Sequence, residues 1–437
     1  MIWSQLYRRR WPLHFLFFGL LLFSVAMLKF IFQPSDQVEL QYKENNLRSS
    51  YDKTQFFTAM QLPSRGEINC SKIIKGDQQE VKRALLHQSN AKNKRFPSNE
   101  MDYLKFTKDC NLYKKIRRFI PIPLSKEEEN FPIAYSMVIH EQINMFERLL
   151  RAIYNPQNIY CVHVDEKSPE NYKEAVRAII SCFENVFLAS KLEKVVYTSW
   201  FRLKADLNCM EDLLKSKVPW RYLLNTCGTD LPIKTNAEIV RALKSLNGKN
   251  SVQSIKPLTY KTVRWQFSYK TDTIIQRTNI IKGPPPISSP LFTGSAYFFV
   301  TREFVTYVLE NPDVQKLIEW VKDTLIPEEH IWATINRMPG VPGSSPYHEK
   351  YDLSDLNAIV RLMKWEDTVG NMDKGAAYPL CTGIFRRGIC INGAGDLHWM
   401  LQQHHLFANK FDPTVDDYAI QCLEEYLRDK ALYEKEP

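Results

Sequence analysis

The amino-acid sequence predicts an α/β fold with a parallel β-sheet, preceded by a membrane anchor. From residue 131 onward, apolar runs of strand length alternate with segments whose apolar residues recur at helical spacing. Such alternation is typical of strand–helix–strand units in a parallel sheet. Near the N-terminus, an apolar run directly follows three consecutive arginines, which is typical of a membrane-spanning segment.

The apolar run covers residues 11–32, long enough to cross a bilayer, and only His14 and Lys29 interrupt it. Because positive charge precedes the run, residues 1–10 are predicted to remain cytoplasmic. A cleaved signal peptide is the alternative, although its apolar core is usually shorter. The length favours an uncleaved signal anchor, which places the rest of the chain in the lumen.

Residues 33–69 are interpreted as a stem, because the segment that follows the anchor is polar and lacks an apolar period. Residues 70–437 form the predicted lumenal catalytic domain. Within it, residues 70–125 combine short helical signals with charge, and we interpret them as a collar that packs on the main domain.

The expected elements then follow in chain order. Strands are predicted over 131–140, 158–165, 220–230 and 294–300, helices over 141–154 and 173–183, and the segments 185–190 and 194–199 continue the series. Ligands of such sheets bind at the carboxyl ends of the strands. His140, Asp165 and Asp230 stand at these ends in the predicted scheme.

Residues 323–335, DTLIPEEHIWATI, predict a helix that starts at Pro327, because apolar residues recur at helical spacing after it. Glu328 and Glu329 then fall in the first turn of this helix. Acidic residues are common there, since they complement the positive end of the helix dipole. The alternative is that one of the two is a catalytic base.

Composition excludes some classes of function. The chain has 437 residues, of which 44% are hydrophobic and 12% aromatic, and this indicates a packed body. The net charge of +9 suits a polyanion, an anionic membrane surface or a phosphate-bearing substrate. No block of five or six basic residues is present, which argues against nucleic-acid binding, and no glycine-rich phosphate loop occurs.

The nine cysteines are scattered, without C-x-x-C pairs or zinc-like spacing. An oxidising compartment would allow four disulfides and leave one thiol. Asn69 stands in the one N-glycosylation sequon, Asn-Cys-Ser, which agrees with a lumenal protein.

Several blocks resemble the β-1,6-N-acetylglucosaminyltransferases that branch mucin-type O-glycans and poly-lactosamine, and most closely the mucin-type core 2/core 4 branch. They are YSMVIH, NIYCVHVDEKS, NTCGTDLPIKTNAEIV, LFTGSAYFFVTREFV, LIEWVKDT, GAGDLHWML and HHLFANKFD. The resemblance extends from about residue 60 to the end of the chain.

This resemblance implies a single-pass type II protein of the Golgi membrane with a variant of the GT-A glycosyltransferase fold. The implied reaction is inverting transfer of GlcNAc from UDP-GlcNAc to the 6-hydroxyl of GalNAc in core 1 acceptors on glycoproteins, with core 3 and I-antigen acceptors left open. The chain has no Asp-x-Asp motif, which the metal-dependent enzymes of this fold use to bind a divalent ion. The family implies that no metal or other cofactor is used.

The resemblance also assigns roles to residues. Glu329 is the implied catalytic base, and Arg387 and Lys410 are the cations that neutralise the departing UDP. The remaining UDP-GlcNAc contacts are Val138, Ile139, His140, Asp165, Glu166, Lys167 and Tyr197. The acceptor contacts are Gln253, Tyr260, Lys261, Arg264, Lys350 and Trp365. The implied disulfides are Cys70–Cys422, Cys110–Cys182, Cys161–Cys209 and Cys381–Cys390, with Cys227 free.

Two positions depart from the family pattern. Gln253 stands where a carboxylate is usual, and Asp367 replaces an aromatic residue of some members. Both changes concern the choice of acceptor. Alternatives to the leading hypothesis are a related β-xylosyltransferase that uses UDP-xylose and a catalytically silent, membrane-anchored lectin on the same fold.

Overall fold

The computed structural model describes residues 55–63, 66–89, 98–345 and 358–433. The chain forms two compact units, Met1–Ala59 and Met60–Pro437. The described residues of the first unit, 55–59, are helical. The predicted anchor over 11–32 lies outside the described residues. In the described ranges, no helix has both the length and the apolar character needed to span a bilayer.

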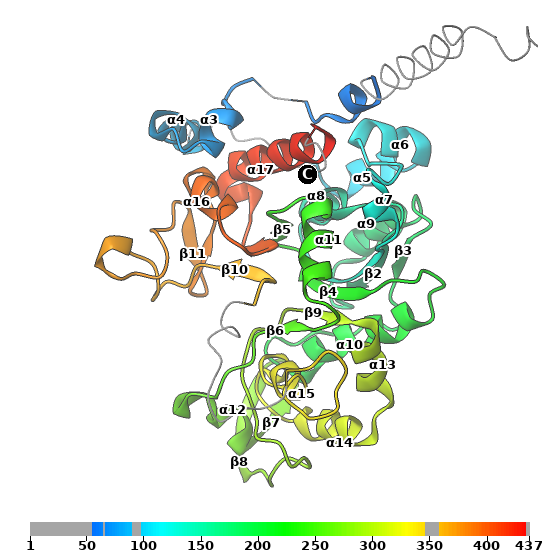
Figure 1. Ribbon diagram of the computed structural model, residues 1–437, viewed down its shortest axis with the longest axis vertical. Helices are drawn as coiled ribbons and strands as arrows, with labels where there is room; N and C mark the ends of the chain where they lie inside the picture. Colours follow the sequence, from blue (N-terminus) through cyan, green and yellow to red (C-terminus); the bar gives the residue numbers. More distant parts are fainter. Residues whose placement is uncertain (1–54, 64–65, 90–97, 346–357, 434–437) are drawn as a thin grey trace, which may run out of the picture. The chain divides into compact units, whose positions relative to one another are not determined.

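A six-stranded sheet is the centre of the second unit, with the strand order β3-β2-β1-β4-β9-β6 (Figure 1). Its strands are β1 (Ile133–Ile139), β2 (Ile159–Val164), β3 (Val186–Leu188), β4 (Tyr222–Cys227), β6 (Ser251–Val252) and β9 (Phe298–Thr301). The first four in this list are parallel, as predicted. The expectation of a purely parallel sheet is wrong, because β9 pairs antiparallel with both β4 and β6.

Every residue of β1 is buried, since helices cover both faces of the sheet. Tyr135 and its neighbours at alternate positions pack against α8 (Ile143–Ile153), α9 (Glu170–Ile180) and α11 (Asn236–Ser245). Ala134 faces the opposite side, where a second core is formed.

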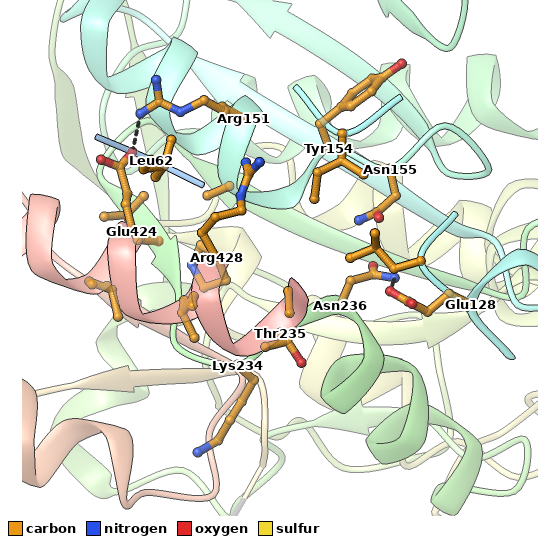
Figure 2. Close-up of a pocket in the computed structure, with 18 residues that line it drawn as sticks. Leu62, Glu128, Arg151, Tyr154, Asn155, Lys234, Thr235, Asn236, Glu424 and Arg428 are labelled. Atoms are coloured by element: carbon orange, nitrogen blue, oxygen red, sulfur yellow. Dashed lines mark hydrogen bonds and ion pairs between the residues drawn. The ribbon is translucent and has the colours of Figure 1, made fainter. Parts of the chain in front are cut away.

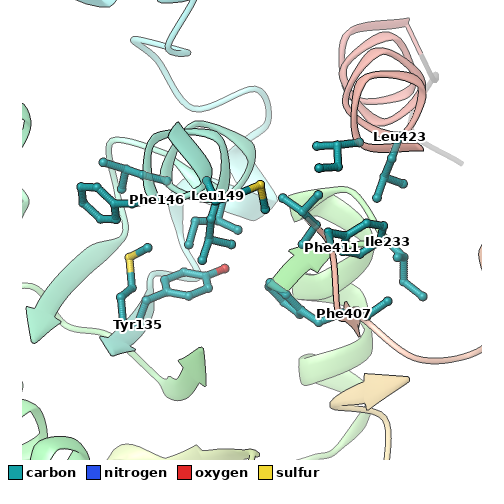
Figure 3. Packing of buried hydrophobic residues seen from close by; sticks show 14 of the residues in the cluster. Tyr135, Phe146, Leu149, Ile233, Phe407, Phe411 and Leu423 are labelled. Atoms are coloured by element: carbon teal, nitrogen blue, oxygen red, sulfur yellow. The ribbon is translucent and has the colours of Figure 1, made fainter. Parts of the chain in front are cut away.

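The second core is built by α10 (Trp200–Leu214), α13 (Arg302–Glu310) and α14 (Pro312–Val321). On the first face, Figure 3 shows Tyr135 of β1 below Phe146 and Leu149 of α8, with Phe407 and Phe411 continuing the core toward the C-terminal helix. A continuous apolar run such as β1 is what burial on both faces requires.

The collar interpretation agrees with the helices that precede the sheet. They are α3 (Cys70–Ile74), α4 (Gln78–Ser89), α5 (Glu100–Phe106), α6 (Cys110–Arg117) and α7 (Lys126–Glu129). The first two pack on the C-terminal helix α17 (Pro413–Tyr433), and α5 packs on α9. Disulfides hold both contacts, Cys70 to Cys422 and Cys110 to Cys182. The other two disulfides are Cys161–Cys209 and Cys381–Cys390, so all four pairs are those that the resemblance implies.

Smaller elements surround the edge of the sheet. A three-stranded sheet has the order β10 (Arg361–Met363), β13 (Phe407–Asn409) and β5 (Asp230–Pro232). Two hairpins are formed by β7 (Phe267–Thr271) with β8 (Ile275–Ile281), and by β11 (Ile384–Arg386) with β12 (Ile389–Ile391). Short helices are η2 (Thr259–Lys261), α12 (Val263–Gln266), η3 (Pro327–Glu329), α15 (Ile331–Ile335), η5 (Met372–Lys374), η6 (Ala394–Asp396) and α16 (Leu397–Leu401).

The predicted strand-like segment over 194–199 is wrong. It forms no strand, and backbone N–H groups of Val195 and of the preceding Glu193 bond instead to side chains at the end of β2. The N–H of Glu193 donates to Nε2 of His163 at 2.8 Å, and that of Val195 donates to Oδ1 of Asp165 at 3.2 Å. Hydrogen bonds to side chains therefore replace a sheet ladder here.

Asp206 of α10 ties the helix to the middle of the sheet. Its fully buried carboxylate accepts from Oγ of Ser136 on β1 at 2.9 Å and from Nδ2 of Asn225 on β4 at 3.2 Å. Nη1 of Arg202, one helical turn earlier, donates to it at 2.7 Å. Asn225 in turn accepts from the N–H of Phe298 on β9 at 3.0 Å. One carboxylate therefore joins α10 to the three central strands.

We predict that Asp206→Ala lowers the free energy of unfolding by about 3–5 kcal/mol, because it leaves the charge of Arg202 buried without a partner. Asp313→Ala is the matched control, since its ion pair with Lys316 is exposed and should contribute less than about 1 kcal/mol. Urea unfolding of the purified proteins measures both. Equal losses in the two variants would contradict the role given to Asp206.

Candidate active site

The carboxyl ends of β1, β2 and β4 meet at one edge of the sheet, where the strand order changes direction. Chain connections run from β1 to β2 on one side and return to β4 on the other, which is where open α/β sheets bind ligands. Val138 pairs in register with Cys227 of β4, and Ile139 pairs with Val164 of β2. His140, the next residue, is exposed. The first three implied donor contacts therefore lie at this edge.

Asp165 organises the loop that follows β2. Its Oδ1 accepts from the N–H of Lys167 at 2.9 Å and from that of Val195 at 3.2 Å, and Nζ of Lys167 lies 3.9 Å from Oδ2. The carboxylate thus holds the turn 165–168 against the segment that leads to Tyr197. Glu166 and Lys167 remain exposed beside it, available to a ligand at the sheet edge.

Arg387 and Tyr197 contact each other although they are distant in sequence. Arg387 has a φ of 55° in the turn between β11 and β12, and the following Gly388 has a φ of 71°, as tight hairpin turns require. The guanidinium carbon lies 4.6 Å from the centre of the Tyr197 ring. The neighbouring Arg386 pairs with Asp412 at 2.7 Å, whereas within the described ranges Arg387 has no carboxylate partner.

Lys410 joins this positive cluster. Its Nζ donates to the backbone oxygen of Arg386 at 3.2 Å. Burial lowers the pKa of Lys410, and the charges of Arg387 and Arg386 lower it further, while Cys227 and Asp230 act in the opposite direction. Positive groups that are held together, with one carboxylate partner for three cations, form a site for an anion.

The thiol of Cys227 lies at the base of this cluster. It is the free cysteine, partly buried, and its sulfur accepts from Nδ2 of Asn409 at 3.5 Å. Burial, reinforced by Asp230, raises the pKa of the thiol. Asp230 itself does not face a ligand at the strand end as predicted. Its carboxylate is fully buried and pairs with Arg361 at 2.6 Å, so its contacts are structural.

The predicted helix over PEEH is interrupted. A 3-10 turn, η3, ends at Glu329, and α15 begins at Ile331. Between them, His330 leaves helical geometry with a φ of −133°. Its buried ring packs 5.2 Å from the ring of Trp265, and its Nε2 bonds to Oγ1 of Thr324 at 3.2 Å. Tertiary packing of the histidine ring therefore overrides the local helical pattern.

The break separates the environments of the two glutamates. Glu329 keeps 30% of its side chain exposed, and its Oε2 accepts from Nη1 of Arg264 at 2.7 Å. Lys261 is close enough for the charges of Arg264 and Glu329 to act on its pKa, which burial lowers. Glu329 is thus an accessible carboxylate oriented by one guanidinium.

Glu328 was predicted to favour a helix start, but its environment is a buried one. It is buried, its Oε2 has no hydrogen-bond partner in the described part of the chain, and burial raises its pKa to about 7. The charge of Arg202 lowers the pKa and that of Glu329 raises it, both less than burial does. Burial, rather than the helix dipole, therefore sets the pKa of Glu328.

A backbone contact connects the cation cluster with the segment that leads to Glu329. The N–H of Ile326 donates to the backbone oxygen of Thr198 at 2.8 Å. Both residues have positive φ, 51° and 65°, which is rare for β-branched residues and marks a functionally constrained position. Tyr197 and Thr198 are adjacent in the chain. Tyr197 contacts Arg387, and Thr198 binds the segment that leads to Glu329.

Gly294 brings Gln253, an implied acceptor contact, close to Glu329. Its N–H donates to the backbone oxygen of Glu329 at 2.8 Å. A Cβ atom at Gly294 would lie 1.7 Å from the backbone oxygen of Gln253, so only glycine permits this approach. Gln253, Glu329 and Arg264 are therefore in one contiguous site. The glycine was not singled out from the sequence, because its constraint arises from a segment some 40 residues away.

The remaining implied acceptor residues are less concentrated. Tyr260 is 69% exposed on η2, near Lys261. Trp365 is 41% exposed and bridges to Ile389 of β12, so it lies on the hairpin that carries Arg387. Asp367 is exposed in the same region. Lys350 lies outside the described residues.

A separate cavity lies under α17 (Figure 2). Apolar side chains line it, together with an ion pair of Arg151 and Glu424 at 2.7 Å. Arg428 donates there to the backbone oxygens of Met60 and Arg118. None of the implied donor or acceptor residues lines this cavity, and its charged groups bind one another, the backbone or, for Glu128, the side chains of Ser125 and Asn236, so we assign it to structure.

Comparison with known proteins decides the family. The sequence model of the Core-2/I-branching enzyme family matches residues 133–401. The chain belongs to this family. A protein of Bos taurus named beta-1,3-galactosyl-O-glycosyl-glycoprotein beta-1,6-N-acetylglucosaminyltransferase 3 is 58% identical over 95% of this chain and 94% of its own length. The protein of the same name from Homo sapiens is 57% identical over 94% and 95%.

A further relative comes from a virus. A beta-1,3-galactosyl-O-glycosyl-glycoprotein beta-1,6-N-acetylglucosaminyltransferase of bovine herpesvirus 4 (strain DN-599) is 58% identical over 91% of this chain and 90% of its own length. The predicted family is therefore confirmed, and this Core-2/I-branching protein is a glycosyltransferase of the β-1,6-N-acetylglucosaminyltransferase type.

In the part of this Core-2/I-branching enzyme that the structure describes, one close group has the residue types of a metal site, Cys381, Cys390 and Asp396. Its two sulfurs form a disulfide and cannot ligate an ion as thiolates. Asp396 is paired with Lys364 at 2.6 Å.

Asn69, the sequon residue, is exposed and caps α3 by accepting from the N–H of Lys72 at 3.1 Å.

We predict that Glu328 makes the stability of the protein depend on pH, because its carboxyl binds a proton more tightly in the folded state than in the unfolded state. The folded carboxyl keeps its proton up to about pH 7, whereas the unfolded one loses it near 4.5. Its contribution is therefore fully present below pH 4.5 and lost as pH rises through 7, by on the order of 2–3 kcal/mol. The difference in unfolding free energy between the native protein and Glu328→Gln should fall across this window.

Urea unfolding between pH 5 and 8 measures this difference. Glu319→Gln is the matched control, because that side chain is exposed on α14 and pairs with Lys322 at the surface. A difference for Glu328→Gln that does not change with pH would show that the carboxyl ionises normally.

Proposed function

We propose that this enzyme transfers GlcNAc from UDP-GlcNAc, with inversion, to the 6-hydroxyl of GalNAc in core 1 O-glycans of glycoproteins. The names of the relatives supply the type of transfer and the glycoprotein acceptor. The observation that carries the proposal is the arrangement around Tyr197 and Thr198. Tyr197 contacts Arg387 of the cation cluster. The backbone oxygen of Thr198 accepts from Ile326, in the segment that leads to the accessible carboxylate of Glu329.

Glu329 is the proposed general base. A single displacement with inversion requires one group that takes the proton from the attacking hydroxyl, and no nucleophile on the enzyme. A carboxylate with partial solvent access can meet that hydroxyl, and Arg264 fixes its orientation from one side.

Arg387 and Lys410 are proposed to stabilise the leaving UDP. As the bond to the sugar breaks, negative charge accumulates on the diphosphate, and fixed cations lower the barrier most when they are in place beforehand. The turn between β11 and β12 and the stacking on Tyr197 hold Arg387 in this way. Burial lowers the pKa of Lys410 most, and the nearby charges of Arg387 and Arg386 lower it further, so a bound diphosphate would favour the charged form of this lysine.

We further propose that catalysis uses no metal ion and that the enzyme is anchored in the Golgi membrane by residues 11–32. The cation cluster provides a physical alternative to a divalent ion, because both compensate diphosphate charge. The disulfide pairs agree with an oxidising, lumenal compartment.

We predict that Glu329→Gln lowers kcat by roughly 10²–10⁴-fold, the usual range for loss of a general base, while UDP binding changes little. Glutamine keeps the size and a hydrogen-bond acceptor for Arg264 but cannot take a proton. Steady-state kinetics and UDP titration measure the two effects, with Glu319→Gln as the exposed control. Near-native kcat in Glu329→Gln would exclude this residue as the base.

We predict that turnover persists in excess EDTA and that Arg387→Ala weakens UDP binding without creating a need for metal. The reason is that the positive charge comes from side chains. Product formation with and without EDTA, followed by addition of manganese, provides the measurement. Loss of most activity on chelation, restored by manganese, would overturn the metal-free mechanism.

A further inference from the structure

A groove at the base of the β7–β8 hairpin has no part in the chemistry described above. Its volume is about 310 Å³. Most of its walls are aromatic, aliphatic or proline side chains, and the lining residues are Trp265, Gln266, Phe267, Ile281, Lys282, Gly283, Pro284, Pro285 and Trp320. A concave, largely apolar groove of this size suits a ligand of several residues.

The walls of the groove are held rigidly. Nε1 of Trp320 donates to the backbone oxygen of Gly283 at 3.1 Å, which fixes the indole ring. Nζ of Lys282 lies 4.7 Å from the centre of this ring and pairs with Asp323, so the one cation of the lining is already neutralised. Phe267 and Ile281 are paired across the hairpin. A groove formed in advance costs a ligand little reorganisation.

Apolar surface is exposed around the groove. Ile281 at the end of β8 is 77% exposed, and Ile280 beside it is 62% exposed. In the preceding segment, Leu258 and Tyr260 are also more than half exposed. Exposed apolar residues that gather beside a groove indicate an interaction site rather than the scattered ones of any surface.

The groove continues from the segment that holds the base. Trp265, one of its walls, directly follows Arg264, whose guanidinium binds Glu329. The ring of Trp265 also packs on His330, the residue after Glu329. The four-residue helix α12 therefore carries, at adjacent positions, Arg264, which contacts Glu329, and Trp265, which lines the groove.

We propose that this groove binds the polypeptide of the glycoprotein acceptor, as an extended, proline-rich segment next to the glycosylated residue. This inference rests on the proposed function. In an O-glycan the first sugar is attached directly to serine or threonine, so the polypeptide lies one sugar ring from the reacting hydroxyl. Aromatic-lined grooves recognise proline-rich segments, which are already extended and lose little entropy on binding.

The lining favours peptide over additional sugar. Sugar hydroxyls need several hydrogen-bonding side chains, but the polar groups of this groove are largely engaged. The amide of Gln266 donates to Thr262 at 3.0 Å, and the ammonium of Lys282 is bound to Trp320 and Asp323. Proline rings need only apolar contact, which the groove supplies.

The test uses three acceptors for the full-length enzyme. The first is the free acceptor disaccharide as a methyl glycoside, the second is the same disaccharide on threonine in a short proline-rich peptide, and the third is a longer oligosaccharide without peptide. We expect kcat/KM for the glycopeptide to exceed that of the disaccharide by about 10-fold, mainly through KM, and the longer oligosaccharide to show no such gain.

Ile281→Asp should abolish the gain with the glycopeptide and leave the free disaccharide unchanged. Ile274→Asp is the matched control, because Ile274 is 61% exposed at the tip of the same hairpin and does not line the groove. It should keep the full gain. Both positions are exposed, so neither substitution disturbs a core.

Three results would overturn the proposal: equal kcat/KM for glycopeptide and disaccharide in the native enzyme, an equal loss on both acceptors in Ile281→Asp, or the gain appearing with the oligosaccharide that lacks peptide. The last result would assign the groove to sugar. Failure of the proposed function has a different signature, since then no acceptor receives GlcNAc in the native enzyme.

Discussion

The position of the whole site depends on the buried carboxylate of Asp206. It accepts hydrogen bonds from β1 and β4 and from Arg202 within its own helix, and thereby fixes α10 on the sheet. A buried charge persists only when every partner is in place, so the arrangement is strictly defined. Because β1 and β4 end at the candidate site, the same carboxylate sets the position of the helix relative to the strand ends that are proposed to bind the donor.

The fixed position of α10 also determines the position of Glu329, the proposed base, through a few covalent and hydrogen-bonded contacts. Helix α10 begins at Trp200, directly after the segment whose Thr198 binds the N–H of Ile326. Three residues later, Glu329 accepts from Arg264 and its backbone binds Gly294. Glu329, the proposed base, is therefore held by contacts on several sides, as a catalytic carboxylate requires.

Much of the fold could be predicted from the sequence, because the central strands are buried on both faces and read as continuous apolar runs. The interrupted helix at His330 could not, since the cause is packing of one ring against Trp265, from a segment far away in the sequence. The same holds for the segment 194–199, where side chains at the end of β2 replace a strand partner. Donor cations and base were named through family resemblance, whereas burial of Glu328 depends on tertiary contacts alone.

The proposed donor residues and the proposed acceptor residues differ in the kind of structural elements on which they lie. Several of the proposed donor residues lie at strand ends, and Arg387 lies on a hairpin whose Arg386 pairs with the buried Asp412. The proposed acceptor residues lie mostly on short elements, η2 and α12, with few buried groups. Gln253 follows β6, and its close approach to Gly294 involves the backbone oxygen rather than the side chain. The residues proposed to set acceptor choice are therefore separate from Glu329, Arg387 and Lys410, which are proposed to carry the chemistry.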